Sequence, residues 1–576
     1  MGDLGQMSYS YQDVPIGTPR SLRVVCMGMG YSGLMMAMII RSKMADANLE
    51  FQIYEKNSDQ GGTWLVNRRY PGCQCDIPAH NYEYSFEPFP EWPNYYATSE
   101  QIHEYMKKTF NKYRCGEFVK FNHEIKRAEW LDMEGKWRLT VEQNGEQLID
   151  VCDVFINAGG VLDHWNWPAI PGIDLFGGKL MHSADWDQSY DFTDKAVAVI
   201  GIGSSGIQIL PQVAKKARKT ALFARSQTWI TPSVGISEPG PDDPDVDETL
   251  NYSLQELSRF KADPEYLRQH RRKLQDGRIQ GFKQFILGSP DQEEAMKMFS
   301  VSMRERLGTS DKGQQIAQQL VPDFPVGCRR LTPGQGFLEA LLEDNVSLEW
   351  RNLDHITTKG IVTTDGRLIE CDAICCATGF DNSFKPRFPI IGKGNVDLAD
   401  QWADLPEGYF GITVAGFPNY FTFIGPNSPI SNGSLVQAIQ ITAVYIAKCI
   451  AKLQKQGVKS MDVTVTAQGD FNEHCRTYLA NTVWSSNCSS WYKQGTTDGK
   501  VVAIYCGSSY HFIEALKEPR WEDYHFEYFG GVRSNRFAYL GNGMTLAETR
   551  GKSVGATQTM NLDEYWNLFN LPSILE

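Results

Sequence analysis

The sequence lacks an excess of positive charge and contains no basic block. Acidic residues number 69 against 56 lysines and arginines in a chain of 576, which gives a formal net charge of −13. A surface of this sign does not attract nucleic acid or an acidic membrane. Short-period repeats and low-complexity tracts are also missing, so we expect two or three globular domains with full hydrophobic cores.

Uninterrupted apolar runs long enough to cross a membrane are missing too. The stretch Val24–Ile40 is broken by glycines, and Val436–Ile450 contains two glutamines and a lysine. The first therefore predicts a strand followed by a helix, and the second predicts a helix that faces the core. Residues 1–20 are polar and predict a loose extension without a secretory signal. We expect a cytoplasmic protein with no membrane span.

Cysteines and histidines do not cluster with the spacing of metal ligands, and we expect no metal site. The thirteen cysteines fall mostly within predicted strands, where a buried thiol behaves as a small hydrophobe. This usage favours a reducing compartment over a disulfide framework. The spacing Cys73-Gln74-Cys75 raises a flavin-linked disulfide reductase as another class, but a single intervening residue would close a strained ring.

The most informative feature present is a pair of Gly-x-Gly-x-x-Gly motifs, at Gly28–Gly33 and Gly201–Gly206. Each follows a predicted buried strand and opens a predicted helix, which is the context of a dinucleotide-binding turn. Two dinucleotides in one chain suggest that electrons pass from one to the other. The predicted strands are residues 21–27 and 195–200, and the predicted helices are residues 34–43 and 207–216. The residues expected at the dinucleotides are Gly28, Gly30, Ser32, Gly33, Gly203, Ser204, Ser205, Gly206 and Gln208.

The two motifs differ at the end of the strand that follows each of them. Glu55 ends the strand Leu49–Glu55, 22 residues after Gly33, and a carboxylate there accepts hydrogen bonds from an unphosphorylated ribose. Arg225 and Ser226 hold the equivalent place in the second copy, where an arginine suits a 2′-phosphate. The first motif is therefore predicted to bind FAD, and the second is predicted to bind NADPH. An exposed strand-end glutamate and a solvated surface arginine are the alternatives.

These features predict an α/β fold with two Rossmann-like dinucleotide-binding domains and a helical insertion in the NADPH-binding domain. The insertion is expected because the pattern becomes helical and charged there, and strand character returns only at Val346–Trp350. The segments Val151–Gly160 and Cys371–Asp381 would carry the chain from one domain to the other. The expected domains are FAD-binding at 1–160 and 380–576, NADPH-binding at 161–226 and 326–379, and the insertion at 227–325.

A rarer string lies between the two glycine motifs, at Phe176-Gly177-Gly178-Lys179-Leu180-Met181-His182-Ser183-Ala184-Asp185-Trp186-Asp187. It follows the pattern Phe-x-Gly-x-x-x-His-x-x-x-Trp-(Pro/Asp), and with it the chain resembles the Baeyer–Villiger family of class B flavoprotein monooxygenases. Related N-hydroxylating and flavin-containing monooxygenases usually carry Phe or Tyr in place of Trp186. The stretches Ser485–Tyr492 and Pro519–Gly543 resemble the fungal secondary-metabolite branch.

The resemblance implies roles for residues at matching positions. The segment Gly327–Arg330 resembles the Gly-Cys-Lys-Arg segment of the family, which makes Arg330 the active-site arginine with Asp76 as its partner. Arg329 replaces a lysine that helps to hold the 2′-phosphate, and Trp491 matches a tryptophan on a mobile loop that folds over NADPH. The stretch before Tyr70 holds one residue more than the family spacing. The implied FAD contacts are Thr63, Trp64, Leu65, Val66, Asp76 and Tyr82.

The family chemistry is an NADPH- and O₂-consuming oxidation that inserts one oxygen beside a ketone carbonyl, through a C4a-peroxyflavin, to give an ester or lactone. Arg330 would keep the peroxide anionic, because a guanidinium stays charged at working pH. His182 is expected to organise the hinge between domains rather than to transfer protons. The resemblance suggests a bulky polyketide, terpenoid or steroid-like ketone as substrate. An S- or N-oxygenating flavin monooxygenase and a catalytically silent flavoprotein stay as alternatives, and the oligomeric state is open.

Overall fold

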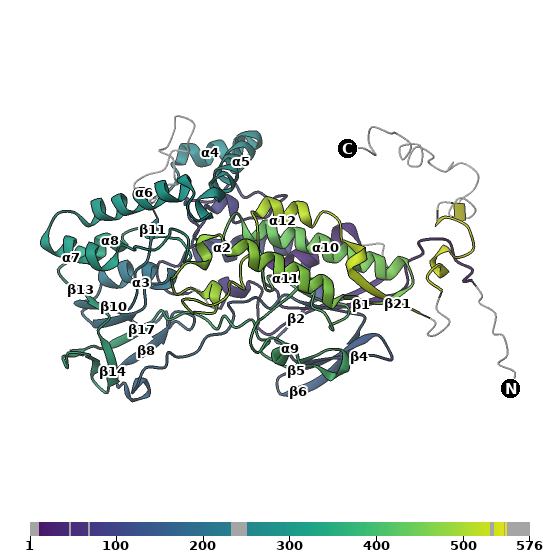
Figure 1. Cartoon of the computed structure of the whole chain (residues 1–576), viewed down its shortest axis with the longest axis horizontal. Helices are drawn as coiled ribbons and strands as arrows, with labels where there is room; N and C mark the ends of the chain where they lie inside the picture. Colours follow the sequence, from purple (N-terminus) through teal and green to yellow (C-terminus); the bar gives the residue numbers. More distant parts are fainter. Residues whose placement is uncertain are drawn as a thin grey trace.

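The computed structural model describes residues 11–44, 48–66, 69–231, 250–529, 535–546 and 548–549. Two lobes lie side by side, and each is built around a five-stranded parallel sheet that carries one glycine motif (Figure 1). The predicted α/β fold, with two Rossmann-like domains and a helical insertion, is confirmed. Predictions for residues 1–10, 45–47, 67–68, 232–249, 530–534, 547 and 550–576 concern parts of the chain outside the described residues.

The first sheet has the strand order β19-β7-β1-β2-β3, and its strands run parallel. Its central strand β1 leads through the glycine turn into helix α1 (Tyr31–Lys43), which begins three residues before its predicted start. The last strand, β19, comes from the C-terminal third of the chain, so distant segments complete one sheet. The strands are β1 (Leu22–Met27), β2 (Leu49–Glu55), β3 (Val119–Phe121), β7 (Val154–Asn157) and β19 (Tyr420–Thr422).

The second sheet has the order β13-β10-β9-β17-β8, and it is parallel as well. Its central strand β9 leads through the second glycine turn into helix α3 (Ser204–Ala214), and helix α8 (Phe337–Leu342) packs on α3. Burial of every residue of β9 explains why this strand reads as an unbroken apolar run. The strands are β8 (Lys179–His182), β9 (Ala196–Ile200), β10 (Lys219–Ala224), β13 (Val346–Trp350) and β17 (Ala373–Cys376).

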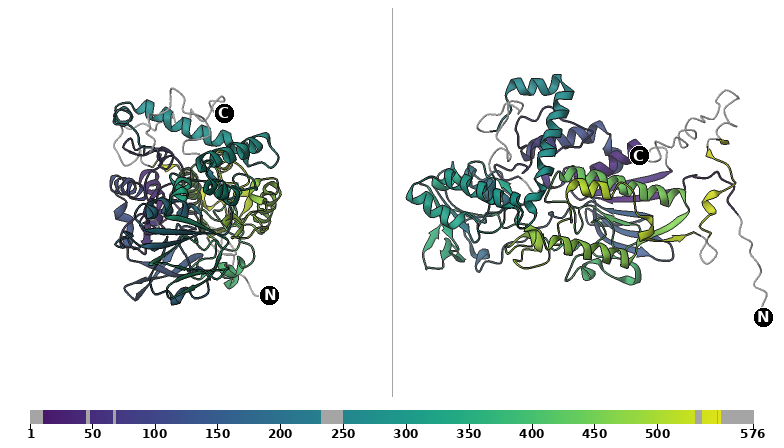
Figure 2. Two further views of the ribbon diagram at one scale, coloured as in Figure 1. Left: turned by 90° about the vertical axis from the view of Figure 1, so that its left-hand side faces the viewer. Right: turned by 45° about the horizontal axis from the view of Figure 1, so that its top comes forward.

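The insertion consists of helices that leave the second lobe and return to it. Serine side chains cap the starts of α4, α6 and α7 by accepting a backbone N–H three residues on. Helices α4 and α5 rise above the junction of the two lobes (Figures 1 and 2). The helices are α4 (Leu254–Ala262), α5 (Pro264–Gln280), α6 (Pro290–Leu307) and α7 (Asp311–Leu320).

Smaller sheets flank each lobe. The sheet β18-β4-β5-β6 packs its buried face, with Trp137 at the centre, on one side of the first sheet. The sheet β14-β15-β16 packs on the second sheet in the same way. Their strands are β4 (Glu124–Leu131), β5 (Lys136–Gln143), β6 (Glu146–Cys152), β18 (Ile390–Ile391), β14 (Leu353–Thr357), β15 (Gly360–Thr363) and β16 (Leu368–Glu370).

Helix α10 (Leu435–Lys455) is the core helix of the C-terminal third. Among the described residues it is the one helix that is long and apolar enough to match a membrane span, and half of that apolar window is buried. It packs against α1 and against β20 (Val458–Val463), as the expected core-facing helix should. The remaining elements of this part are α11 (Val465–Leu479), α12 (Ser509–Ala515) and β21 (Tyr524–Tyr528), and α2 (Ser99–Lys112) and α9 (Leu398–Gln401) lie earlier in the chain.

The segment Val151–Gly160 contains the end of β6 and all of β7, which a bend at Asp153 separates. The Asp153 carboxylate accepts hydrogen bonds from Arg20 and from the backbone N–H of Arg23. The cysteine usage, which favours thiols over a disulfide framework, has one exception, because a disulfide joins Cys328 to Cys488. The other eleven cysteines, Cys73 and Cys75 included, remain thiols.

Candidate active site

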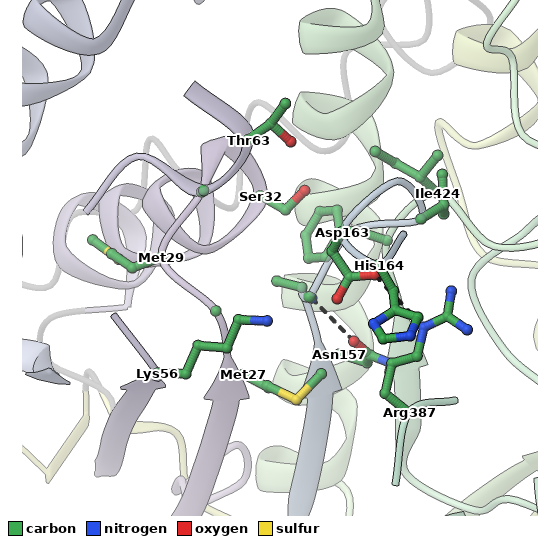
Figure 3. Close-up of a pocket in the computed structure, with 18 of the residues that line it drawn as sticks. Met27, Met29, Ser32, Lys56, Thr63, Asn157, Asp163, His164, Arg387 and Ile424 are labelled. Atoms are coloured by element: carbon green, nitrogen blue, oxygen red, sulfur yellow. Dashed lines mark hydrogen bonds and ion pairs between the residues drawn. The ribbon is translucent and has the colours of Figure 1, made fainter. Parts of the chain in front are cut away.

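The first glycine motif opens onto a cavity of about 670 Å³. The cavity lies at the carboxyl ends of β1, β2 and β7, the edge at which parallel sheets bind their ligands. Figure 3 shows Ser32 and Thr63 across this space from Asp163 and His164. The sequence-predicted residues that line it are Gly28, Gly30, Ser32, Glu55, Thr63, Trp64, Val66 and Tyr82.

The glycine turn presents backbone to this cavity. A Cβ on Gly28, whose φ is +96°, would lie 2.7 Å from the carbonyl oxygen of Ala158, and a Cβ on Gly33 would lie 2.0 Å from that of Gly28. Gly33 is therefore a packing residue, which lets α1 approach β1. At Gly30 the nearest atom to such a Cβ belongs to Gly62, 3.6 Å away. The space in front of the helix N-terminus suits a pyrophosphate.

Glu55 is buried at the rim of the cavity. Its Oε2 accepts a hydrogen bond from the backbone N–H of Met29 at 2.7 Å, and its Oε1 accepts from the backbone and side-chain nitrogens of Asn57 at 2.8 and 2.6 Å. Oε2 keeps one further lone pair, whereas both acceptor positions of Oε1 are filled by Asn57. The carboxylate is thus held in one orientation and can accept a ribose hydroxyl.

Three aromatic side chains form an apolar wall beside the turn. The ring of Tyr82 meets the rings of Tyr31 and Trp64 edge-on, with centroids 5.5 and 5.4 Å apart. Ile424 and Val436 line the cavity from the C-terminal third. Such a wall excludes water from the space that it borders.

The second glycine turn repeats the packing of the first. A Cβ on Gly206 would lie 2.0 Å from the carbonyl oxygen of Gly201, while a Cβ on Gly203 would meet nothing within 4 Å. The hydroxyl of Ser204 contacts that of Thr332 at 2.6 Å, and Ser205 is half-buried in the first turn of α3. Open space again lies at the helix N-terminus, where an anion would bind.

Two arginines lie in the same region near the end of β10, close enough for one charge to act on the other. The Nη1 atom of Arg329 donates to the hydroxyl of Ser226 at 2.8 Å and to the carbonyl of Gln227 at 2.6 Å. Burial and the positive charge of Arg225 both lower the pKa of Arg329. An anion bound by both arginines would relieve this repulsion, so the donor set fits a 2′-phosphate.

Gln208 joins the two lobes. Its Oε1 accepts from the hydroxyl of Tyr70 at 2.8 Å, and its Nε2 donates to the carbonyl of Gln74 at 3.0 Å. Both ends of the predicted cofactor residue thus have protein partners. Leu65, another predicted contact, packs at Gly61 rather than on the cavity.

The structure brings Asp76 and Arg330 together across the junction of the lobes. Nε of Arg330 donates to Oδ2 of Asp76 at 2.6 Å, and Nη2 donates to Oδ1 at 2.8 Å. Its Nη1 donates to the carbonyl of Ile430 at 2.6 Å. Burial lowers the pKa of Arg330, but Asp76 outweighs that effect and raises it above the ordinary value. The two side chains are 26% and 21% exposed, so the pair is sheltered but reachable.

Tyr492 is a member of this cluster that the sequence did not single out. Its side chain is buried beside the guanidinium of Arg330, where it helps to raise the pKa of that arginine. Trp491, the predicted loop residue, is half-buried with its ring 4.8 Å from that of Tyr492. The sequence placed Tyr492 only at the end of the stretch Ser485–Tyr492 and assigned it no role.

Further unpredicted residues line the cavity at its polar end. Arg387 donates to the carboxylate of Asp381 at 2.6 Å and lies 3.8 Å from that of Asp163. Lys56 and His164 also face this space (Figure 3). These residues come from loops after strands, where no periodic pattern marks them.

His182 is enclosed where the chain passes between the lobes. Its ring stacks on Trp165 at a centroid distance of 4.3 Å, and its nitrogens contact the Thr378 hydroxyl and the Ala184 backbone N–H. Burial lowers its pKa to about 4. A neutral, fully engaged ring supports the hinge interpretation rather than proton transfer.

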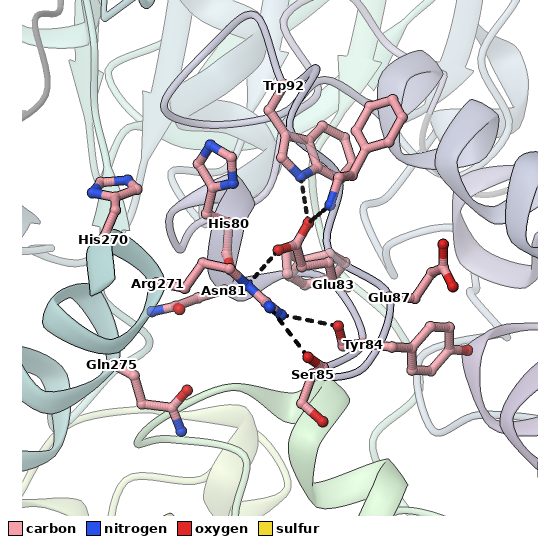
Figure 4. A network of polar contacts seen from close by, with 12 residues as sticks. His80, Asn81, Glu83, Tyr84, Ser85, Glu87, Trp92, His270, Arg271 and Gln275 are labelled. Atoms are coloured by element: carbon pink, nitrogen blue, oxygen red, sulfur yellow. Dashed lines mark hydrogen bonds and ion pairs between the residues drawn. The ribbon is translucent and has the colours of Figure 1, made fainter. Parts of the chain in front are cut away.

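A second buried network joins the insertion to the first lobe (Figure 4). The carboxylate of Glu83 lies 2.6 Å from Nε of Arg271 on α5 and accepts from the indole N–H of Trp92 at 2.8 Å. Arg271 also donates to the carbonyls of Tyr84 and Ser85 at 3.0 and 3.1 Å. The loop that carries Tyr82 is therefore held by a residue of the insertion.

Comparisons with known proteins agree with this geometry. The family described as flavin-binding monooxygenase-like matches residues 21–241. The FAD-binding monooxygenase tazF of Aspergillus terreus is 39% identical over 91% of this chain and 92% of its own length. A Baeyer–Villiger monooxygenase of Pseudomonas aeruginosa is 31% identical over 90% of this chain and 94% of its own. A solved oxidized steroid monooxygenase bound to NADP superposes with a TM-score of 0.71 at 27% identity, covering 88% of this chain and 99% of that one.

Proposed function

The chain belongs to the flavin-binding monooxygenase-like family and is a monooxygenase of the Baeyer–Villiger type; from that premise we propose that it inserts one oxygen atom beside the carbonyl of a bulky ketone. The observation that carries the proposal is the two-point contact between Arg330 and Asp76 at the junction of the lobes. The named similarity to a steroid monooxygenase supports a polycyclic or comparably large ketone.

FAD fits the cavity of the first lobe, and NADPH fits the second glycine turn. The side-chain-free turn at Gly30 and the oriented Glu55 suit an unphosphorylated dinucleotide. The open turn at Gly203 and the pair Arg225 and Arg329 suit a 2′-phosphate. When bound, FAD reduced by NADPH activates dioxygen so that one oxygen atom can be transferred to a substrate.

Arg330 would stabilise the negative charge that develops on the transferred oxygen. A guanidinium does not lose its proton in proteins, and Asp76 and the carbonyl of Ile430 hold it in one plane. Because these contacts exist before a substrate arrives, no reorganisation is needed during the reaction.

The aromatic wall would keep water away from the same place. Tyr31, Trp64 and Tyr82 pack edge-on beside the cavity, and the start of α10 adds Val436. Protonation of the activated oxygen by water would release it as hydrogen peroxide, and the NADPH would then be oxidised without forming ester. Exclusion of water from the site therefore couples NADPH oxidation to ester formation.

The test is product analysis on a mixed panel of ketones and sulfides. We expect the purified holoenzyme with NADPH and O₂ to convert at least one bulky polycyclic ketone to an ester, detected by mass spectrometry as the gain of one oxygen. Formation of sulfoxides with no ester from any ketone would instead assign an S-oxygenating enzyme. NADPH oxidation that no ketone accelerates would also overturn the proposal.

A further inference from the structure

The disulfide between Cys328 and Cys488 joins two segments that meet at the candidate active site. The cysteines are 160 residues apart in sequence, with Cα atoms 6.4 Å apart. Both side chains are buried, Cys328 fully and Cys488 to all but 4%. Cys328 stands two residues before Arg330, and Cys488 stands four residues before Tyr492.

The upstream end of the Cys488 segment is packed against the insertion. Trp484 stacks on Phe285 at a centroid distance of 5.2 Å. Gly327 lies under the same ring, because a Cβ there would be 2.6 Å from Phe285. The backbones of Thr482 and Ile286 pair in an isolated antiparallel β-bridge. The segment just before Cys488 is therefore held in place by its packing on the insertion.

The downstream end reaches the arginine. Tyr492 is buried beside Arg330 and helps to raise the pKa of its guanidinium. Lys493 closes the loop by donating to the carbonyls of Ser486 and Thr497, both at 2.5 Å. Residues between these anchors, such as Ser485 and Asn487, are exposed, so the loop meets solvent on its outer side.

We propose that the Cys328–Cys488 disulfide is a redox-sensitive tether that positions Tyr492 on Arg330, so that its reduction loosens the loop and uncouples NADPH oxidation from oxygen insertion. The inference rests on the proposed function. Tyr492 acts through Arg330 and is thus a positioning residue. The disulfide restricts the conformations of the loop that carries Tyr492. When the disulfide is reduced to two thiols, the loop regains this conformational freedom.

Reduction by a dithiol balances in two exchange steps. One thiolate of the dithiol attacks one sulfur of the disulfide and forms a mixed disulfide, which releases the other cysteine as a thiol after protonation. The second thiol of the reagent then attacks the mixed disulfide. Cys328 and Cys488 end as thiols, and the dithiol ends as a cyclic disulfide, having supplied two electrons and two protons.

Peptide mapping of the holoenzyme tests the bond without reference to activity. Alkylation before digestion should leave one cross-linked peptide pair that contains Cys328 and Cys488 and disappears after dithiothreitol. Two alkylated thiols at these positions in enzyme purified without reductant would overturn the proposal. A cross-link between Cys475 and Cys506 in its place, whose sulfurs lie 3.1 Å apart as thiols, would overturn it as well.

Hydrogen exchange then tests the tether. We expect residues 483–495 to exchange faster in dithiothreitol-treated enzyme and in the variant Cys328→Ser/Cys488→Ser. The control Cys371→Ser changes a half-buried thiol on the second lobe and should leave this exchange unchanged. Equal exchange in reduced and oxidised enzyme would refute positioning by the bond, and the reagent provides this answer even if the double variant does not fold.

Coupling is the functional readout. Dithiothreitol should lower the yield of ester per NADPH in the wild type and in Cys371→Ser, but not further in Cys328→Ser/Cys488→Ser. Tyr492→Phe should keep the disulfide and lower the yield roughly tenfold, as loss of a polar group beside a charged one predicts. Wild-type coupling in Tyr492→Phe would remove its positioning role. If the oxidised wild type makes no ester at all, the proposed function fails, while mapping and exchange still decide the tether.

Discussion

Arg330 meets Asp76 through two nitrogens of one plane, Nε and Nη2. A lysine could not make this contact, because an ammonium is a compact charge without a fixed plane. The carbonyl of Ile430 holds the third nitrogen. At the scale of single residues, these contacts thus fix the orientation of the Arg330 guanidinium, which stays protonated at any working pH.

Replacing that charge should separate NADPH consumption from product formation. We expect Arg330→Ala to bind FAD and oxidise NADPH while ester formation falls by about 10²–10³, the loss of roughly 3–4 kcal/mol of charge stabilisation. Parallel assays of NADPH, ester and hydrogen peroxide measure this split. In Arg329→Ala the KM for NADPH should rise instead, because its side chain contacts Ser226 beside the expected phosphate site. Ester production by Arg330→Ala at the wild-type rate would contradict the role.

His182 gives a pH prediction at the same scale. Burial lowers its pKa to about 4, whereas an unfolded histidine titrates near 6.5. Between these pH values the unfolded chain binds a proton at His182 that the folded chain does not. The contribution of the neutral His182 ring to the free energy of unfolding is therefore complete above about pH 6.5 and is lost as the pH falls toward 4. Between pH 7 and pH 4.5, the free energy of unfolding should fall by about 2–3 kcal/mol more in the wild type than in His182→Gln. Denaturant titrations at both pH values measure this, and equal losses would argue against a buried neutral ring.

At the scale of elements, the two glycine turns show how one pattern contains different constraints. Gly33 and Gly206 are required by packing, because a Cβ at either would lie 2.0 Å from a carbonyl oxygen. Gly203 has an ordinary φ of −76° and open space around it. The pattern shows where the turns are, and the surrounding chain shows what each glycine does.

Alanine at Gly203 should mainly weaken NADPH binding, whereas alanine at Gly206 should mainly lower the stability of the fold. Gly203→Ala should cost no more than about 1 kcal/mol of stability at a helix N-cap, yet raise the KM for NADPH about tenfold or more, since a methyl group would occupy the anion site. Gly206→Ala should destabilise the fold by about 1–3 kcal/mol or more, because the helix must move away from its strand. Thermal unfolding and NADPH titrations distinguish the two, and unchanged NADPH affinity in Gly203→Ala would place the phosphate elsewhere.

At the scale of the whole molecule, the lobes meet through polar contacts that link distant segments. Asp76 with Arg330 and Tyr70 with Gln208 cross the junction. Arg271 reaches from the insertion to Glu83 (Figure 4). Burial raises the pKa of Glu83, and the charge of Arg271 opposes that rise. The insertion is thus part of the frame that holds the first lobe.

Removing this cation should expose its structural importance. Arg271→Gln leaves the carboxylate of Glu83 buried without its partner, and the free energy of unfolding should fall by about 3–5 kcal/mol. Arg271→Gln/Glu83→Gln should recover part of that loss, because no buried charge remains. Arg268→Gln on the same helix, where Arg268 pairs with exposed Glu265, should change stability by less than about 1 kcal/mol. Simple additivity of the two single changes in the double variant would contradict a coupled pair.

Much of the fold could be predicted because its signals are local. The strands before Gly28 and Gly201 and the acid and arginine that end the next strands stand in fixed sequence relation to the motifs. Asp76 and Arg330 were found through family resemblance, not through spacing, since they are 254 residues apart. Tyr492 and the partner of Cys488 had no comparable signal. A pairing between distant residues leaves no periodic trace in the chain.

The sequence by itself determined the two dinucleotide turns, the helical character of the insertion and the contrast between Glu55 and Arg225, because short-range sterics and hydrogen bonding specify them. Only the tertiary structure decided that Cys328 bonds Cys488, that Gln208 binds Tyr70, and that the insertion holds the loop of Glu83. Such contacts depend on how two lobes meet, and that meeting is set by the packing of whole surfaces rather than by neighbours along the chain.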